Sequence, residues 1–379
     1  MRPEGQRLLA SSDTEEAGGG GAANWTKVKS AMAAAEGKPS FFRSLSNISL
    51  VQEVAPSAHT RYDPELWLPT MRAAFDTIGP FVIRPWLGLT VLTLGMCLTS
   101  SLYDKPPWWT TMPGFAHTVL GGALSFIMVF RTNTAYSRWW EARLMWGTIT
   151  VTSRSIGTQA SSMLREPAHL TALLIVFPAV VKNTLRDEST EAAELSAAEA
   201  LLASASTPHP AVSSLATLIA QPSPANAVVQ AMAQVVRTGL VKDQPGEPEG
   251  LAASAYLHLS SDLRNLTAAA TACERIKTSP MPLGYVSALR FFLLIWLVTL
   301  PLTLIGSYGG AATPAVSVIA FLFLNLENVA MEIEQPFGRD ANDLPLEEYC
   351  AGIERVLLGL SRTRGAVTGA PSVAVESVS

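Results

Sequence analysis

Patterns for binding metals or forming disulfides are missing from this sequence. Its three cysteines, Cys97, Cys273 and Cys350, are odd in number, widely spaced and without a CxxC pair, so neither a disulfide framework nor a zinc site is predicted. The five histidines lie far apart and none has the spacing of a ligand pair, which argues against a catalytic metal centre. A glycine-rich phosphate-binding motif is also missing, which argues against an ATP-driven pump.

Charged residues are scarce as well. Only 15% of the 379 residues are charged, whereas 48% are hydrophobic, and the apolar residues are gathered in runs. The formal net charge is −4, from 27 basic and 31 acidic residues, so no nucleic-acid partner is expected. This composition is typical of a membrane protein with water-facing parts.

Uncharged runs predict four membrane-spanning helices. The first covers 85–103 and the second 113–130, and a 36-residue run over 291–326 is interrupted by glycines within 306–310, so it holds two more. The two short turns contain a single basic residue, Lys105. By the positive-inside rule, both termini and the large middle region lie on the cytoplasmic-type side.

The second uncharged run ends in a basic and aromatic stretch, 130–143. Arginines dominate from Arg131 onwards, as expected where a span meets the cytoplasmic face. The aromatic spacing predicts that the helix continues beyond the membrane. We expect Arg138, Glu141 and Arg143 to form a salt-bridged face, with Trp139 and Trp140 in the core.

The remaining sequence predicts a helical domain between the two pairs of spans. Its longest apolar run, 171–181, is too short to cross a membrane and suggests a buried helix. The predicted organisation is a disordered arm over 1–60, an interfacial helix and two spans over 61–130, a cytosolic or stromal domain over 131–284 with an Ala/Ser/Pro-rich insert at 187–224, two spans over 285–335, and a loop, helix and disordered tail over 336–379.

Two long motifs resemble the bestrophin family. They are the stretch 130–143 and the stretch 332–346, which contains the turn Pro336-Phe337-Gly338. The similarity covers about 61–360 and is nearest to the bacterial and plant branch, which includes voltage-dependent chloride channels of thylakoids. It implies an all-α integral membrane protein that assembles as a homopentamer, with four spans per subunit and a helical cytosolic domain.

The resemblance also implies where the pore lies. In that family the second spans line a central pore whose neck is a set of stacked hydrophobic rings. Counting back eight residues from Arg138 places neck rings at Phe130 and Phe126, with Gly122 at the third level. The family usually has a bulkier apolar residue at that level, so the neck here is either wider at its outer end or constricted by Val119.

Phenylalanines one helical turn apart suit an anion path on chemical grounds. Repeated about an axis, they form a dry constriction that gates by dewetting or passes weakly hydrated ions. The positive edge of a phenyl ring favours chloride, bromide, nitrate or bicarbonate over cations. The alternative is that Phe126 and Phe130 simply pack or face lipid. Arg131 adds a positive ring at the pore mouth if it faces the axis, or else neutralises Glu141 or reaches lipid head groups.

Two further sites follow from the resemblance. Asp340 and Asp343 match acidic positions of the calcium-binding loop found in calcium-activated members, and two carboxylates with a few carbonyls hold calcium weakly. The structural alternative is that they cap the following helix. A second, cytosolic aperture aligns with Val241. No cofactor is required.

The predicted function is therefore an anion channel, for chloride and as a second candidate bicarbonate, and not an enzyme. The alternative is a proton-coupled carrier or membrane enzyme that uses Glu327, Glu332 and His117, although Glu327 is more simply a structural partner of an arginine such as Arg84. The resemblance favours a thylakoid or other plastid membrane, whereas acidic residues near the N-terminus do not fit a transit peptide.

Overall fold

The computed structural model describes residues 79–102, 107, 109, 112–212, 214–240, 251–340 and 342–368. All of them belong to one compact unit, 62–379, and every regular element within these ranges is a helix. The predicted N-terminal arm, the interfacial helix, the C-terminal tail and Val241 lie outside the described residues.

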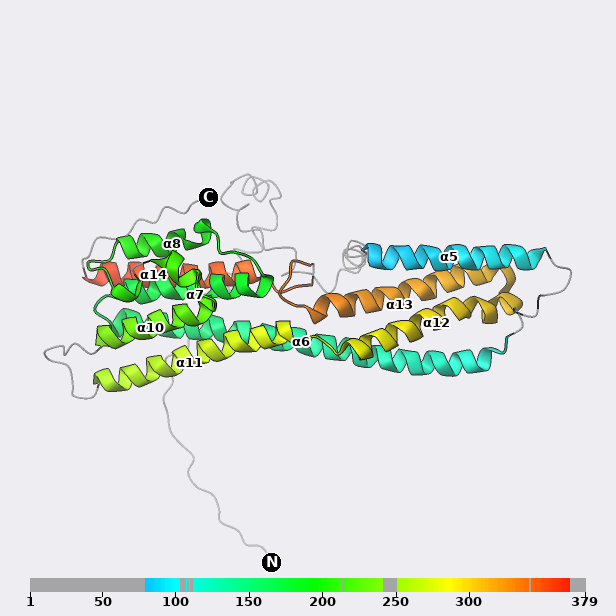
Figure 1. Cartoon of the computed structure of the whole chain (residues 1–379), viewed down its shortest axis with the longest axis horizontal. Coiled ribbons are helices and arrows are strands. Elements are labelled where there is room, and N and C mark those ends of the chain that lie inside the picture. The colour runs from blue at the N-terminus through cyan, green and yellow to red at the C-terminus, as the bar shows by residue number, and fades with distance from the viewer. Residues whose placement is uncertain are drawn as a thin grey trace, which may run out of the picture. The chain divides into compact units, whose positions relative to one another are not determined.

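Four helices have the length and exposure of membrane spans, which confirms the predicted number. They are α5 (Pro80–Ser101), the first half of α6 (Gly114–Met163), α12 (Leu283–Tyr308) and α13 (Ala312–Glu334) (Figure 1). The last two form a hairpin that turns at Gly309, where φ is +53°. That positive φ suits glycine, which has no Cβ to clash with the backbone.

The spans are longer than the uncharged runs that predicted them. The first begins at Pro80, before Arg84, and the third begins at Leu283 and so includes Arg290. The fourth extends past Glu327 to Glu334. The uncharged runs end at these charged residues, but the range predicted for the last two spans, 285–335, includes Arg290, Glu327 and Glu334. A charge that is paired or close to the membrane surface is tolerated in a span.

One further helix, α7 (Ala168–Arg186), also has the length and composition of a span. Its surroundings differ, because 89% of its most apolar segment is buried inside the protein, against 22% for α5, 17% for α6 and 39% for the segment Leu283–Glu334 that holds α12 and α13. A helix covered on all sides by protein is a core helix. The prediction of a buried helix around 171–181 is confirmed.

The helical domain packs around α7 and the second half of α6. Its other elements are α8 (Ala192–Ala203), η2 (Pro210–Val212), α9 (Leu215–Ile219), α10 (Pro224–Leu240), α11 (Leu251–Thr278) and α14 (Leu346–Thr368). Fully buried Trp146, Phe177 and Leu259 occupy its core. The insert at 187–224 contributes Leu195 and Leu201 to that core, so it packs as part of the domain.

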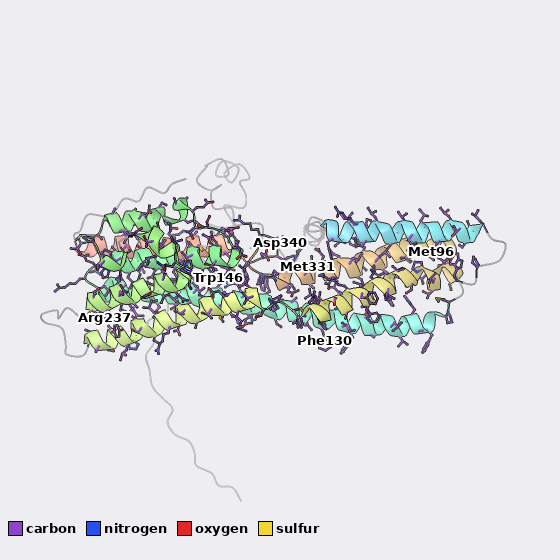
Figure 2. All side chains as sticks on the ribbon, in the orientation of Figure 1. Met96, Phe130, Trp146, Arg237, Met331 and Asp340 are labelled. Carbon is purple, nitrogen blue, oxygen red and sulfur yellow. The ribbon has the colours of Figure 1, made fainter. Side chains whose placement is uncertain are left out.

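Helix α6 joins the spans to the helical domain without a break, as predicted from the aromatic spacing. Its 50 residues correspond to about 75 Å at 1.5 Å per residue. Phe130 lies on α6 near the spans and Trp146 lies farther along it, in the helical domain (Figure 2). At Gly157 a Cβ would lie 2.3 Å from Cδ2 of Leu357, so glycine permits the close approach of α14. A single continuous helix therefore connects the spans with the helical domain.

Candidate functional site

One face of α6 is exposed in the subunit and carries no charge from end to end. At about 100° per residue, side chains within about 40° of Phe126 recur every three or four positions. Phe126 is 64% exposed and Phe130 51%. All positions of this uncharged face are exposed or partly exposed: Phe115, Val119, Gly122, Phe126, Phe130, Asn133, Ser137, Trp140, Leu144, Thr148, Val151, Ser155, Thr158 and Ser162.

The two phenylalanines contact each other edge to face. Their ring centroids lie 4.7 Å apart and the planes meet at 87°, a favourable geometry for aromatic pairs. An apolar groove of about 770 Å³ runs beside them, between α6 and the start of α12. It is lined by Phe126, Ile127, Phe130, Thr134, Met281, Pro282, Tyr285, Ala288, Leu289 and Phe292. Such a surface must be covered by lipid or protein in the membrane.

Gly122 lies on the same face, one turn before Phe126. Apart from its chain neighbours and its own helix backbone, no atom of the described residues lies within 4 Å of the Cβ that a larger residue would place there. Val119, at the next level, is exposed. The subunit itself therefore leaves the third level open, and Val119 is the bulky side chain nearest to it on this face.

Arg131 does not lie on this face, which corrects the prediction of a pore-mouth charge. It sits about 140° around the helix from Phe126 and is 0% exposed. Its Nη2 lies 2.8 Å from Oε2 of Glu334 and its Nε lies 3.5 Å from Oε2 of Glu327. Buried between two carboxylates, its charge is neutralised within the subunit.

Glu327 has a different partner from Arg84, the one suggested by the sequence. Glu327 Oε1 accepts from Nε of Arg290 at 2.9 Å, and its other oxygen faces Arg131, whereas Arg84 is exposed. Sequence reasoning missed Arg290 and Glu334. The available signal was the seven-residue spacing of Glu327 and Glu334, which places both on one face of α13.

The Arg-Trp-Trp stretch forms no salt-bridged face along the helix. Arg138 instead donates to the carbonyl oxygens of Ser279 (2.5 Å) and Ile276 (2.6 Å), at the end of α11. Glu141 pairs with Arg275 at 2.5 Å. Trp140 is 48% exposed on the uncharged face of α6 and is not a core residue of the subunit. This stretch fastens α6 to α11 and to the loop that follows it.

Asp340 and Asp343 do not cap α14, which begins at Leu346. Oδ2 of Asp343 accepts the backbone N–H of Asp340 at 2.7 Å, and the Asp343 N–H donates to the carbonyl of Asp340 at 3.0 Å. The nearby Glu332 carboxylate is taken up by the side-chain amides of Asn328 and Asn342. Among the described residues no three His, Cys, Asp or Glu side chains lie close enough together to hold a metal ion, and weak calcium binding by Asp340 and Asp343 with nearby carbonyl oxygens stays a prediction.

The carboxyl of Asp343 is buried, which raises its pKa. Burial raises the pKa of its carboxyl from 3.8 to about 6, and the Asp340 charge adds to the rise, while the hydrogen bond from the Asp340 N–H opposes it. Because the folded protein holds this proton more tightly than the unfolded chain, the unfolding free energy falls as pH rises from about 4 to about 6 and is level above that.

We predict that this loss amounts to roughly 2–3 kcal/mol, since each unit of pKa shift is about 1.4 kcal/mol. Asp343→Asn keeps the oxygen that accepts the Asp340 N–H but cannot ionise. The variant's thermal midpoint, measured in detergent between pH 4 and 7, should therefore lack this part of the decline. An identical decline in wild type and variant would contradict the assignment.

His117, the one histidine within a described span, is held by an aromatic neighbour. Its ring stacks on Trp296 with centroids 4.8 Å apart and planes at 12°, and Trp296 Nε1 donates to the His117 carbonyl. A ring packed in this way fits a structural role. Glu332, another of the proposed proton carriers, accepts hydrogen bonds from the side-chain amides of Asn328 and Asn342.

Comparison with known proteins gives a consistent result at the level of sequence and fold. The family profile described as Bacterial/Fungal Bestrophin protein matches residues 59–358. A voltage-dependent anion channel-forming protein of Escherichia coli is 30% identical over 280 residues, covering 71% of this chain and 85% of the relative. A protein of the same description from Synechocystis is 26% identical over 319 residues, covering 78% and 91%.

A solved structure has the same fold. The crystal structure of a mutated bacterial bestrophin homologue from Klebsiella pneumoniae superposes with a TM-score of 0.62 at 26% identity. The match covers 74% of this chain and 98% of that one. The similarity therefore extends over both the spans and the helical domain.

Proposed function

Because the chain belongs to the bestrophin family, we propose that it forms an anion channel in a membrane. Relatives of the chain carry the name voltage-dependent anion channel-forming protein. The observation that carries the proposal is the uncharged face of α6, which bears the exposed Phe126 and Phe130 and stays free of charge along the half of the helix beyond the span. The chain is a channel protein rather than an enzyme.

The pore forms when several copies turn this face towards a common axis. Within a single subunit the described spans pack around a small apolar core, with Leu124, Leu297 and Val316 fully buried. The apolar groove beside Phe126 and Phe130 provides a surface for the adjacent copy. The family resemblance supports an assembly of five copies.

Selectivity for anions comes from the phenyl rings and not from a charged mouth. With Arg131 neutralised inside the subunit, the positive edges of Phe126 and Phe130 are the groups on the face that attract an anion. Below them, Asn133 and Ser137 provide uncharged polar side chains where an ion regains hydrogen bonds. Chloride and bicarbonate both fit such a path, as do other small monovalent anions.

Electrical recording tests the proposal. Purified protein in a planar bilayer should carry a current whose reversal potential follows the chloride gradient and does not change with a proton gradient. Replacing chloride by bicarbonate on one side ranks the two anions. A current coupled to pH would support the proton-coupled carrier, and the absence of current at every voltage would reject the channel.

The compartment is part of the same proposal. The resemblance to thylakoid chloride channels supports a thylakoid or other plastid membrane, and a relative occurs in the cyanobacterium Synechocystis. There an anion path would balance the charge moved by proton pumping. A fluorescent fusion of the full chain would locate it, and a signal confined to another membrane would reject this placement.

A further inference from the structure

A buried cluster of four charges lies at the end of the spans nearest the helical domain. Arg131 of α6 faces Glu327 and Glu334 of α13, and Arg290 of α12 binds Glu327. The two positive and two negative charges cancel. Arg131 and Glu327 are 0% and 1% exposed in their side chains, whereas Arg290 is 38% exposed.

Each described span takes part in this cluster. The guanidinium of Arg290 also lies over the ring of Phe81 in α5, with its Cζ 5.3 Å from the centroid. Met281, just before α12, donates its backbone N–H to Glu334 Oε1 at 2.9 Å, and Nη1 of Arg131 lies 2.6 Å from its sulfur. Glu327 is the residue that links both arginines, with one carboxylate oxygen towards each.

Arg131 is held mainly by electrostatic attraction to the two carboxylates, and less by well-aligned hydrogen bonds. Its Nε and Nη2, and Oε2 of Glu327, have no partner with hydrogen-bond geometry among the described residues, although opposite charges lie 2.8–3.5 Å away. In a low-dielectric interior such charges attract strongly without fixing an angle. The cluster therefore resists separation of the helices while allowing them to rotate slightly.

The cluster lies next to the proposed gate, by which we mean the constriction formed by Phe126 and Phe130. Arg131 follows Phe130 in the chain, so a force on its side chain acts on the helical turn that carries the ring. A buried ion cluster is a poor source of stability compared with an apolar core, yet it opposes any shift that would leave one charge unpaired. Sliding α6 past α13 is such a shift.

We infer that Glu327 is a positioning residue for the gate: through Arg131 it holds the Phe130 turn of α6 in its neck position, and through Arg290 it ties that position to α12. This inference rests on the proposed channel function. Glu327 does not touch the ion path, since it lies on α13 behind the pore helix. It acts on the equilibrium between closed and open pores, and the selectivity of the rings is independent of it.

Single-channel recording of Glu327→Gln tests the inference. Glutamine keeps the size of the side chain and removes the charge that holds both arginines. Open probability should rise by about twofold to thirtyfold, the range typical for residues that couple two elements of a protein, while the reversal potential continues to follow chloride. Glu327→Asp retains the charge and should remain closer to wild type. A purely structural role would lower the yield of assembled protein without changing the open probability.

A matched control is available on the same pore helix. Glu141 pairs with Arg275 at 2.5 Å, but both side chains are well exposed. Glu141→Gln therefore removes an exposed ion pair away from the buried cluster and should leave gating unchanged. An equal effect of Glu141→Gln would show that the response is a general effect of charge, and would overturn the inference.

The outcomes separate the two proposals. Absence of anion current in the wild-type protein would reject the channel function itself. Normal wild-type current with unchanged or lowered open probability in Glu327→Gln would overturn the role of Glu327 alone. If that variant fails to assemble, Arg290→Gln removes only the partly exposed end of the cluster and should raise open probability in the same direction. Failure of both variants to assemble would make the cluster a folding element and overturn the inference.

Discussion

Replacing both Phe126 and Phe130 with alanine should increase the anion current at low voltage by about tenfold or more, which is the effect of removing about 1.4 kcal/mol from a barrier. The rings are exposed on the uncharged face of α6, and an apolar constriction blocks ions by excluding water. Alanine widens the constriction and lets water enter. Discrimination between anions and cations should weaken as well, because the phenyl edges are lost.

Leu120 provides the matched control for this experiment. It is an exposed apolar residue of the same helix, but it lies about 120° around α6 from Phe126. Leu120→Ala should therefore leave conductance and selectivity unchanged. Planar-bilayer recordings under a chloride gradient give both quantities. If the double alanine variant conducts and selects like wild type, Phe126 and Phe130 do not form the neck.

Trp146→Ala should lower the unfolding free energy by roughly 3–5 kcal/mol, the usual cost of deleting a buried aromatic side chain. Trp146 is 0% exposed in the core of the helical domain and its ring lies 6.1 Å from that of Tyr349 on α14. Its removal leaves a cavity between α6 and α14. The thermal midpoint of the assembled protein should fall by roughly 6 °C or more.

Two further variants serve as controls for the effect of Trp146→Ala on stability. Trp146→Phe retains most of the apolar volume and removes an Nε1–H that has no partner in the described part of the chain, so its cost should be smaller. Leu257→Ala truncates an exposed side chain of the same domain and should shift the midpoint little. A Trp146→Ala protein that melts like wild type would contradict the proposed core.

Much of the fold could be predicted because membrane spans leave a strong local signal. Long uncharged runs revealed four spans, and the glycines before Ala311 located the turn between the last two, where Gly309 adopts a positive φ. The aromatic spacing after Phe130 correctly extended α6 beyond the membrane. Each of these features depends on residues close together in the chain.

The pairing of charges at the ends of the spans is not a local signal. Arg290 and Glu327 lie 37 positions apart and neutralise each other, so each charge is acceptable in a span beyond the end of the uncharged run. For α7, sequence length and composition do not distinguish a core helix from a span. The surrounding helices decide, because they bury most of its apolar surface.

The sequence by itself determined the class of the protein, the number of spans and the two phenylalanines one turn apart, since composition and helical periodicity are local properties. The tertiary structure alone decided the role of Arg131. Its position next to Phe130 in the chain suggested a charge at the pore mouth. On the helix, however, its side chain points away from the face of Phe130 and lies between Glu327 and Glu334. The direction a side chain takes, and the charge that meets it there, depend on which helices pack together.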